Sequence, residues 1–176
     1  MKFTPTPLEG AFLVEIEPVG DERGFFARTW CAEEFQARGL DPHLAQCSFS
    51  FNTRRGTLRG MHYQGPPYEE AKLVRCSSGA IYDVILDLRP GSRTYCKWFH
   101  AELTASTRQM LYVPRGFAHG FQTLADDTEV VYLISAPYRP EYGRGVRWDD
   151  PLFGIRWPIR DPILSERDRR FPDFKP

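Results

Sequence analysis

The stretch that decides the fold reads GTLRGMHYQGPPYEEAKLVRCSSGAIYDVILDL and runs from Gly56 to Leu88. Apolar and polar side chains alternate along much of it, and Gly-Pro-Pro and Ser-Ser-Gly interrupt it where chains commonly turn. The pattern predicts one strand, a break at Gly65–Pro67, and then a hairpin of two strands about Ser77–Gly79. The predicted strands are Leu58–Gln64, Ala71–Cys76 and Ala80–Leu88.

Short strand patterns continue on both sides of this stretch. They are Ala11–Pro18, Phe25–Trp30 (a short strand or an extended arm), Ala45–Thr53, Trp98–Leu103, Met110–Val113, Phe121–Thr123 and Glu129–Ser135. A turn is predicted at Asp21–Gly24, a short helix at Ala32–Ala37, and a helical turn at Ser165–Arg169 with Ser165 as its N-cap. Many short strands separated by turns predict an all-β sandwich or barrel, with the Pro-rich and charged segment Trp148–Pro176 wrapped on it as a tail.

Length and charge narrow the class of protein. A chain of 176 residues with 41% hydrophobic residues predicts one domain, residues 1–176, with a full core and a pocket. The 23 basic residues balance the 23 acidic ones, which argues against nucleic acid or an anionic membrane surface as the main partner. No segment has the apolar length of a membrane span, and the N-terminus lacks the apolar run of a signal peptide.

The cysteines indicate the redox environment. They are scattered, form no CxxC pair, and suit reduced thiols in a cytoplasmic protein. They are Cys31, Cys47, Cys76 and Cys96.

The opening stretch also carries the chemistry. It places Arg59, His62 and Lys72 close together in the sequence, near a Gly-Pro turn. Two cations and a histidine suit an anion site at which a proton is moved. The second stretch with such a residue is PRGFAHGF, from Pro114 to Phe121, which supplies His119. Each residue has a plainer reading, since a lone histidine is more often packed in a core or caps a turn, and lone cations are usually solvated.

The spacing of these residues resembles the two motifs of the cupin superfamily, a small β-barrel fold. Metal-binding cupins carry H-x-H and a glutamate in the first motif and a histidine in the second. Here Gln64 stands where the second histidine of H-x-H would be, which disfavours a metal site. A metal enzyme of the dioxygenase kind, using His62, Glu69 and His119 as three ligands, remains one alternative.

A longer resemblance covers nearly the whole chain in order. The segments that carry it are DERGFF (Asp21–Phe26), RRGTLRGMHYQ (Arg54–Gln64), KLVRCSSGAIYDVILDLRPGSRTY (Lys72–Tyr95), LYVPRGFAHGFQTL (Leu111–Leu124), EVVYLISAPYRP (Glu129–Pro140), RWDDP (Arg147–Pro151), the WP at Trp157 and LSERD (Leu164–Asp168). They are similar to the dTDP-4-dehydrorhamnose 3,5-epimerase family. The resemblance implies a homodimeric cupin-type jelly-roll barrel without metal or cofactor. It also implies a reaction of deoxysugar biosynthesis, in which C3, C5 or both are inverted in a nucleotide-activated 4-keto-6-deoxyhexose.

The same resemblance implies catalytic roles. The C4 ketone acidifies the neighbouring C–H bonds, so a base on one face and an acid on the other can invert a carbon through an enolate. By resemblance His62 is the base, which suits an imidazole at neutral pH, and Asp168 orients it. Tyr132 is the acid on the opposite face, and Lys72 stabilises the enolate oxygen.

Further roles concern substrate binding. By resemblance Arg59 grips the diphosphate, for which a guanidinium fork is suited, and His119 supports the reacting region. An N-terminal arm that carries Arg23 and Phe26 reaches across the dimer to the partner's nucleotide. Tyr138 is a further ligand contact.

The chain departs from the family pattern near the nucleotide. Arg28 stands where an acidic residue is usual, and Gly143 where a glutamate is usual. The usual Q-x-N pair, counted back from Gly56, falls on Cys47 and Phe49. The expectation is kept chemistry with a changed nucleotide handle: cytosine or another base, or thymine bound differently. A sugar-nucleotide-binding barrel without catalysis is the second alternative.

Overall fold

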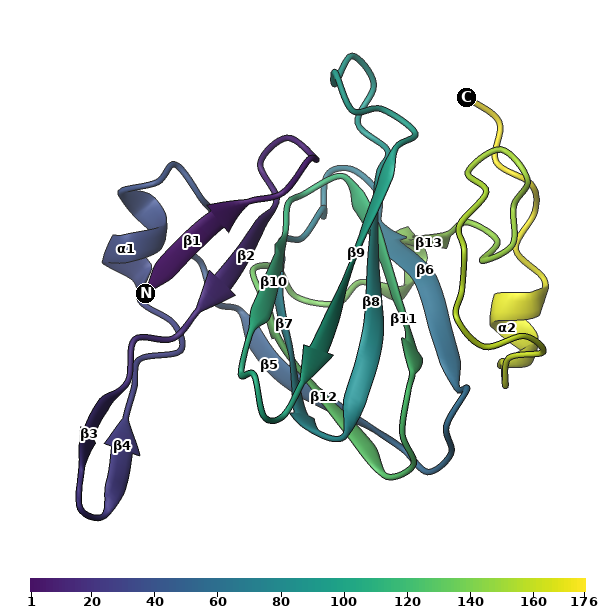
Figure 1. Ribbon diagram of the computed structural model, residues 1–176. Helices are drawn as coiled ribbons and strands as arrows, with labels where there is room; N and C mark the ends of the chain where they lie inside the picture. Colours follow the sequence, from purple (N-terminus) through teal and green to yellow (C-terminus); the bar gives the residue numbers. More distant parts are fainter.

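Two antiparallel sheets face each other in the computed structural model, which describes residues 1–176 (Figure 1). The first sheet has the order β1 (Lys2–Pro5), β2 (Phe12–Glu15), β10 (Met110–Val113), β7 (Lys72–Ser78), β12 (Thr128–Ile134) and β5 (Gln46–Asn52). The second has the order β13 (Gly143–Gly145), β6 (Leu58–Gln64), β11 (Phe117–Thr123), β8 (Ala80–Asp87) and β9 (Trp98–Thr104). The prediction of an all-β fold is confirmed.

The main core lies between the two sheets. Val74 of β7, Ile85 of β8 and Phe121 of β11 belong to one buried cluster with residues of β10 and β12. The alternation of β8 predicts one half-apolar face, but both of its faces are buried. Its outward residues Tyr82, Val84 and Leu86 pack under Val146, Phe153 and other residues of the C-terminal segment. The tail is therefore an outer layer of the second sheet, as expected for a wrapped segment.

A second cluster covers the outer face of the first sheet. Helix α1 (Ala32–Gln36) packs there through Phe35, which is 1% exposed and whose ring meets Phe3 and Tyr112 edge-on at centroid distances of 5.3 and 5.6 Å. The helix has five residues and no side-chain N-cap bond, so tertiary packing holds it rather than intrinsic helix stability. The only other helices are η1 (Pro140–Tyr142) and α2 (Glu166–Arg169). No helix has both the length and the apolar character needed to cross a bilayer.

The arm is a hairpin of β3 (Val19–Asp21) and β4 (Gly24–Phe26), which projects away from the barrel (Figure 1). The predicted turn at Asp21–Gly24 closes it. The predicted strand Phe25–Trp30 is wrong beyond Phe26, because no neighbouring strand pairs with the residues that follow.

Other strands were missed or shortened in the sequence prediction. The three residues of β13, Gly-Arg-Gly, have no strand propensity of their own, and pairing with β6 makes them extended. Strand β1 ends in a proline at the edge of its sheet, which hides its pattern. Strand β11 begins at Phe117, four residues before the predicted Phe121, because it pairs with β8 along its full length. His119 therefore lies in a central strand, not in a turn.

Candidate active site

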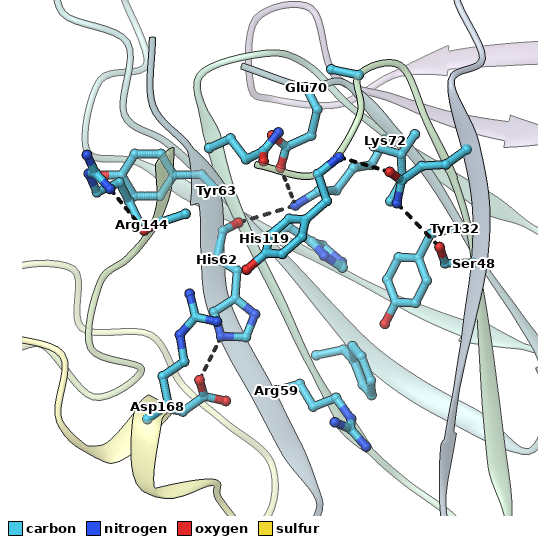
Figure 2. A pocket seen from close by; sticks show the side chains of 18 of the residues that line it. Ser48, Arg59, His62, Tyr63, Glu70, Lys72, His119, Tyr132, Arg144 and Asp168 are labelled. Atoms are coloured by element: carbon cyan, nitrogen blue, oxygen red, sulfur yellow. Dashed lines mark hydrogen bonds and ion pairs between the residues drawn. The ribbon is translucent and has the colours of Figure 1, made fainter. Parts of the chain in front are cut away.

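One pocket of about 450 Å³ opens between the sheets, and most of the predicted site residues line it (Figure 2). Strands of both sheets and the segment around α2 contribute to its wall. The predicted residues that line it are Arg59, His62, Lys72, His119, Tyr132, Tyr138 and Asp168. Residues far apart in the sequence thus meet in one pocket.

A histidine–carboxylate pair forms one side of the pocket. His62 Nε2 lies 2.7 Å from Asp168 Oδ1, and the backbone N–H of Gly60 donates to Asp168 Oδ2 at 3.4 Å. Burial pushes the pKa of Asp168 up, but the hydrogen bond and charge of His62, with the bonds from Gly60 and Ser165, outweigh it, so this pKa lies below its ordinary value. Asp168 is therefore an anion that holds the imidazole.

Local structure positions Asp168. Ser165 Oγ accepts the backbone N–H of Asp168 at 3.1 Å, which confirms Ser165 as the N-cap of α2. Gly60 has a φ of +147°, and a β-carbon on it would lie 2.6 Å from Gly120 Cα of β11. Glycine there lets β6 and β11 approach closely and leaves the Gly60 N–H free for the carboxylate.

Tyr132 stands on the opposite side of the pocket from His62 (Figure 2). Its hydroxyl is 3.3 Å from Ser50 Oγ. Burial, with the nearby charge of Asp83, raises the pKa of Tyr132 well above that of an ordinary tyrosine, against the smaller effects of Ser50 and Arg59. The phenol therefore holds its proton at neutral pH.

Lys72 and Glu70 form an ion pair in the pocket wall. Lys72 Nζ lies 3.0 Å from Glu70 Oε1, and it also donates to the backbone carbonyl of His62 at 3.4 Å (Figure 2). Both side chains are largely buried, at 12% and 6% exposed. The sequence analysis singled out Lys72 and Glu69, but Glu70 is the acid that lines the pocket.

A second histidine–carboxylate pair is buried behind the first. His119 Nε2 lies 2.7 Å from Asp83 Oδ1 of β8, and the edge of its ring faces Tyr132 at a centroid distance of 6.2 Å. The sequence analysis did not find this partner. Its signal was an acid in the middle of an apolar strand, which needs a partner when buried.

Arg59 is held at the far end of the pocket by Asn52. The Arg59 Nε donates to Asn52 Oδ1 at 2.7 Å, and one terminal nitrogen reaches the Phe51 carbonyl at 3.4 Å. No carboxylate pairs with this guanidinium. It is therefore suited to bind an anion.

The donors of the metal alternative are not brought together. Gln64 donates to the carbonyls of Tyr68 and Pro137 and accepts the N–H of Arg139, so it ties loops together. Glu69 does not line the pocket. No group of three or more histidine, cysteine or acidic side chains is arranged to hold a metal ion.

The predicted nucleotide-end positions require a correction on β5. Residues of a strand point alternately to its two faces, and Gln46 and Ser48 are the ones that line the pocket. Cys47 and Phe49 are exposed on the outer face, Phe49 by 70%. The count back from Gly56 was thus one residue off, since no local pattern fixes which face is inward. Gly143 does line the pocket.

The arm residues do not reach the pocket of their own chain. Arg23 is paired with Asp21 of the same hairpin, with Nε 3.2 Å from a carboxylate oxygen, and Phe26 is 80% exposed. Arg28 pairs with Glu34 of α1 at 3.2 Å. Within one chain, none of these three residues lines the site.

Phe171 of the tail packs against a residue of the site, a contact that no sequence signal indicated. Its ring lies edge-on to His62 at a centroid distance of 5.9 Å. Gly145 of β13 pairs with His62 of β6. The Phe171 ring packs directly on Gly145, so a β-carbon at this position would overlap the ring. The missing side chain of Gly145 thus lets the tail pack against His62.

Gly145→Ala is expected to displace Phe171 and to lower turnover on the order of 10- to 100-fold by loosening His62. Turnover and thermal unfolding measure this. Phe171→Ala tests whether Gly145→Ala acts through Phe171. If it does, the double variant Gly145→Ala/Phe171→Ala should lose no more activity than Phe171→Ala alone. Additive losses would show that Gly145 acts by another route.

Asp168→Asn is expected to lower turnover roughly 10²-fold or more, since an amide cannot stabilise an imidazolium ion. Because the folded-state pKa of Asp168 is lowered, its ionised form stabilises the fold at neutral pH, and this contribution is lost as pH falls through the lowered pKa. The Tm gap between wild type and Asp168→Asn should therefore narrow from pH 7 to pH 3. The exposed Asp161→Asn is the control, and a gap that stays constant with pH would contradict the assignment.

A two-sheet barrel whose pocket sets a histidine–carboxylate pair against a tyrosine is typical of one class of protein, the jelly-roll enzymes of the cupin type. Residues 5–176 match the family model described as dTDP-4-dehydrorhamnose 3,5-epimerase. The chain belongs to this family, and it is a carbohydrate epimerase.

Individual relatives agree over the full length. The dTDP-4-dehydrorhamnose 3,5-epimerase of Sinorhizobium fredii is 42% identical over 175 residues, which is 99% of this chain and 90% of that protein. The enzyme of the same name from Bacillus anthracis, solved with TDP and PPi bound, has a TM-score of 0.94 at 39% identity and covers 98% of this chain and 99% of its own. ChmJ, a 3'-monoepimerase from Streptomyces bikiniensis solved with dTDP-quinovose, has a TM-score of 0.87 at 37% identity, covering 96% and 86%.

Proposed function

We propose that this protein inverts C3, C5 or both in a nucleotide-activated 4-keto-6-deoxyhexose, with a dTDP sugar as the substrate class. The observation that carries this proposal is the pocket in which His62 and Tyr132 stand on opposite sides and which Lys72 also lines. The family supports it, since relatives are named for this reaction and bind dTDP or dTDP sugars. The expectation of a changed nucleotide base is replaced by that of thymine. Two of the residues on which it rested, Cys47 and Phe49, point away from the pocket.

The first half-reaction is proton removal by His62. The ionised Asp168 accepts a hydrogen bond from Nε2, which puts the imidazole proton on that nitrogen and leaves Nδ1 as the basic one. Nδ1 takes the proton from the carbon next to the C4 ketone. The C–H electron pair becomes the C=C bond of the enolate, and the C=O π pair moves to the oxygen. The Lys72 ammonium stabilises the resulting enolate oxygen.

The second half-reaction is reprotonation from the other face. The enolate electrons return to carbon and take the proton of the Tyr132 hydroxyl, which inverts that carbon. The raised pKa of Tyr132 keeps this proton in place until the enolate forms. The His119–Asp83 pair lies against Tyr132 and supports the charge on that side.

Substrate binding uses the rest of the pocket. We propose that Arg59 binds the diphosphate, and that Gln46, Ser48 and Tyr138 lie along the nucleotide. Thermal shift with dTDP, CDP, UDP and GDP tests the base, because a ligand of the native state raises Tm. The expected order puts dTDP first.

We further propose a homodimer in which the arm carries Arg23 and Phe26 to the partner's nucleotide. The arm exposes Val19, Phe25 and Phe26, and the outer face of β5 exposes Phe49 and Phe51. Large exposed apolar side chains on two surfaces are consistent with surfaces that are covered in a dimer. Sedimentation gives the oligomeric state, and Arg23→Ala should weaken dTDP binding; a monomer that binds dTDP with full affinity would contradict this.

The whole chain acts as one domain, and its free cysteines suit the cytoplasm.

Solvent deuterium exchange tests the reaction. With dTDP-4-keto-6-deoxyglucose in D₂O, NMR should show the C3 or C5 hydrogen replaced by deuterium only when the protein is present. Which of the two positions exchanges also distinguishes single from double epimerisation. Tight binding with no exchange would instead support a binding barrel without catalysis, and exchange that requires an added metal ion would support the metal alternative.

A further inference from the structure

The two cations that the sequence analysis singled out are held by partners of different kinds. Lys72 pairs with the carboxylate of Glu70, with Nζ 3.0 Å from Oε1, so its charge is balanced inside the protein. Arg59 is held by the side-chain amide of Asn52, whose Oδ1 accepts from Arg59 Nε at 2.7 Å. An amide accepts this hydrogen bond without carrying a negative charge, so the positive charge of Arg59 is left for another anion.

Asn52 is itself fixed in the barrel. It is the last residue of β5, is 2% exposed, and donates through Nδ2 to the backbone carbonyl of Thr128 on the neighbouring strand β12 at 3.1 Å. Because both halves of the amide are bonded, its orientation is determined, with Oδ1 toward Arg59. A buried and rigid acceptor thus holds a side chain that is otherwise exposed to solvent.

The same contact decides which edge of the Arg59 guanidinium is available to a ligand. Asn52 occupies Nε, and all the other N–H groups lie on the two terminal nitrogens. One of these nitrogens has only a long contact, of 3.4 Å, with the Phe51 carbonyl. The terminal nitrogens form a fork that matches two oxygens of a phosphate group, and Arg59 lines the pocket.

We propose, on the basis of the proposed function in which Arg59 binds the diphosphate, that Asn52 is the positioning residue for this group. Asn52 does not line the pocket, so it acts through Arg59 and not by touching the substrate. It fixes the guanidinium before the ligand arrives, so that less side-chain entropy is lost on binding. Its neutrality leaves the charge of Arg59 to the diphosphate, for which an aspartate of the same shape would compete.

The affinity for dTDP relative to thymidine isolates the diphosphate, and calorimetric titration measures both Kd values. The two ligands share the base and the sugar, so a variant that only disturbs the pocket weakens both. Asn52→Ala removes the contact, and it should lower the preference for dTDP by about 2- to 10-fold, the cost of immobilising one long side chain.

Asn52→Asp keeps the shape of the side chain and adds a negative charge beside Arg59 Nε. It should lower the preference for dTDP by about 10-fold or more at low salt, because the carboxylate repels the diphosphate and neutralises its partner. Salt screens charges, so the difference between wild type and Asn52→Asp should shrink as the salt concentration rises. A purely structural role of Asn52 would not give this salt dependence.

Gln122→Glu is the matched control. Gln122 is another buried amide, bonded through both of its halves to the backbone of Ile159, and it does not line the pocket. Its replacement should lower Tm, because a carboxylate cannot donate to the Ile159 carbonyl, and should leave the dTDP preference unchanged. In an Arg59→Ala background, Asn52→Ala should likewise cause no further loss of preference, because the side chain that it positions is absent.

A dTDP preference that Asn52→Ala leaves at its wild-type value, or an equal loss of affinity for both ligands, would overturn the proposal. A loss of preference that persists in the Arg59→Ala background would overturn it as well. Failure of the proposed function gives a different result, since the wild type itself would then bind dTDP no more tightly than thymidine.

Discussion

His62→Ala is expected to abolish hydrogen exchange at C3 and C5 while dTDP still binds. A general base contributes about 10²- to 10⁴-fold, and the one other histidine that lines the pocket, His119, is paired with Asp83. The nucleotide is expected to bind elsewhere in the pocket, at Arg59 and β5, so its affinity should change little. NMR-detected exchange and calorimetric titration with dTDP measure the two quantities separately.

The matched control is His43→Ala. His43 is exposed, and its ring pairs only with Asp41 outside the pocket, so this variant removes an imidazole without touching the site. It should keep full activity. Exchange retained by His62→Ala at the wild-type rate would remove His62 from the role of base, and loss of dTDP binding would show that the substitution had disturbed the pocket as a whole.

Tyr132→Phe is expected to separate exchange from inversion. The variant keeps the ring and its packing but lacks the hydroxyl proton. In the wild type this proton stays on the phenol at neutral pH, because burial raises the pKa of Tyr132. His62 can still remove a proton and return a deuteron to the same face. Net epimerisation should therefore fall by about 10²-fold or more, while exchange of the hydrogen on the His62 side falls much less.

Tyr112→Phe serves as the comparison for Tyr132→Phe. Tyr112 is another buried tyrosine, but its hydroxyl accepts the backbone N–H of Asp41 and lies outside the pocket. Its removal should cost stability and leave the ratio of inversion to exchange unchanged. Full epimerisation by Tyr132→Phe would assign the acid role to another group.

Much of the fold was predictable because strand patterns are local. The stretch from Leu58 to Asp87 contains β6, β7 and β8 where alternation and turn residues placed them, with bounds shifted by one or two residues. Strand β13 and the first half of β11 were not predictable in this way. Their extended form comes from pairing with β6 and β8, which are distant in the sequence.

The residues of the site also differ in whether local sequence could predict them. The residues His62, Lys72 and Arg59 could be singled out because their types and spacing carry chemistry within a few residues of each other. Glu70, the partner of Lys72, and Asp83, the partner of His119, could not be assigned to these residues, because an acid in or beside a strand gives no local sign of what it will face. The face of β5 was misjudged for a related reason, since a shift of one residue exchanges the two faces of a strand.

The sequence by itself determined that this chain forms a barrel of short strands, that it resembles one family of epimerases, and that a histidine and two cations lie at its centre. These follow from period, turn chemistry and motif, which are properties of neighbouring residues. Only the tertiary structure decided that Asp168 holds His62, that Asp83 holds His119, that Phe171 fills the space over Gly145, and that Glu70 pairs with Lys72. Each of these depends on which distant segments the closing of the two sheets brings within hydrogen-bond or van der Waals distance.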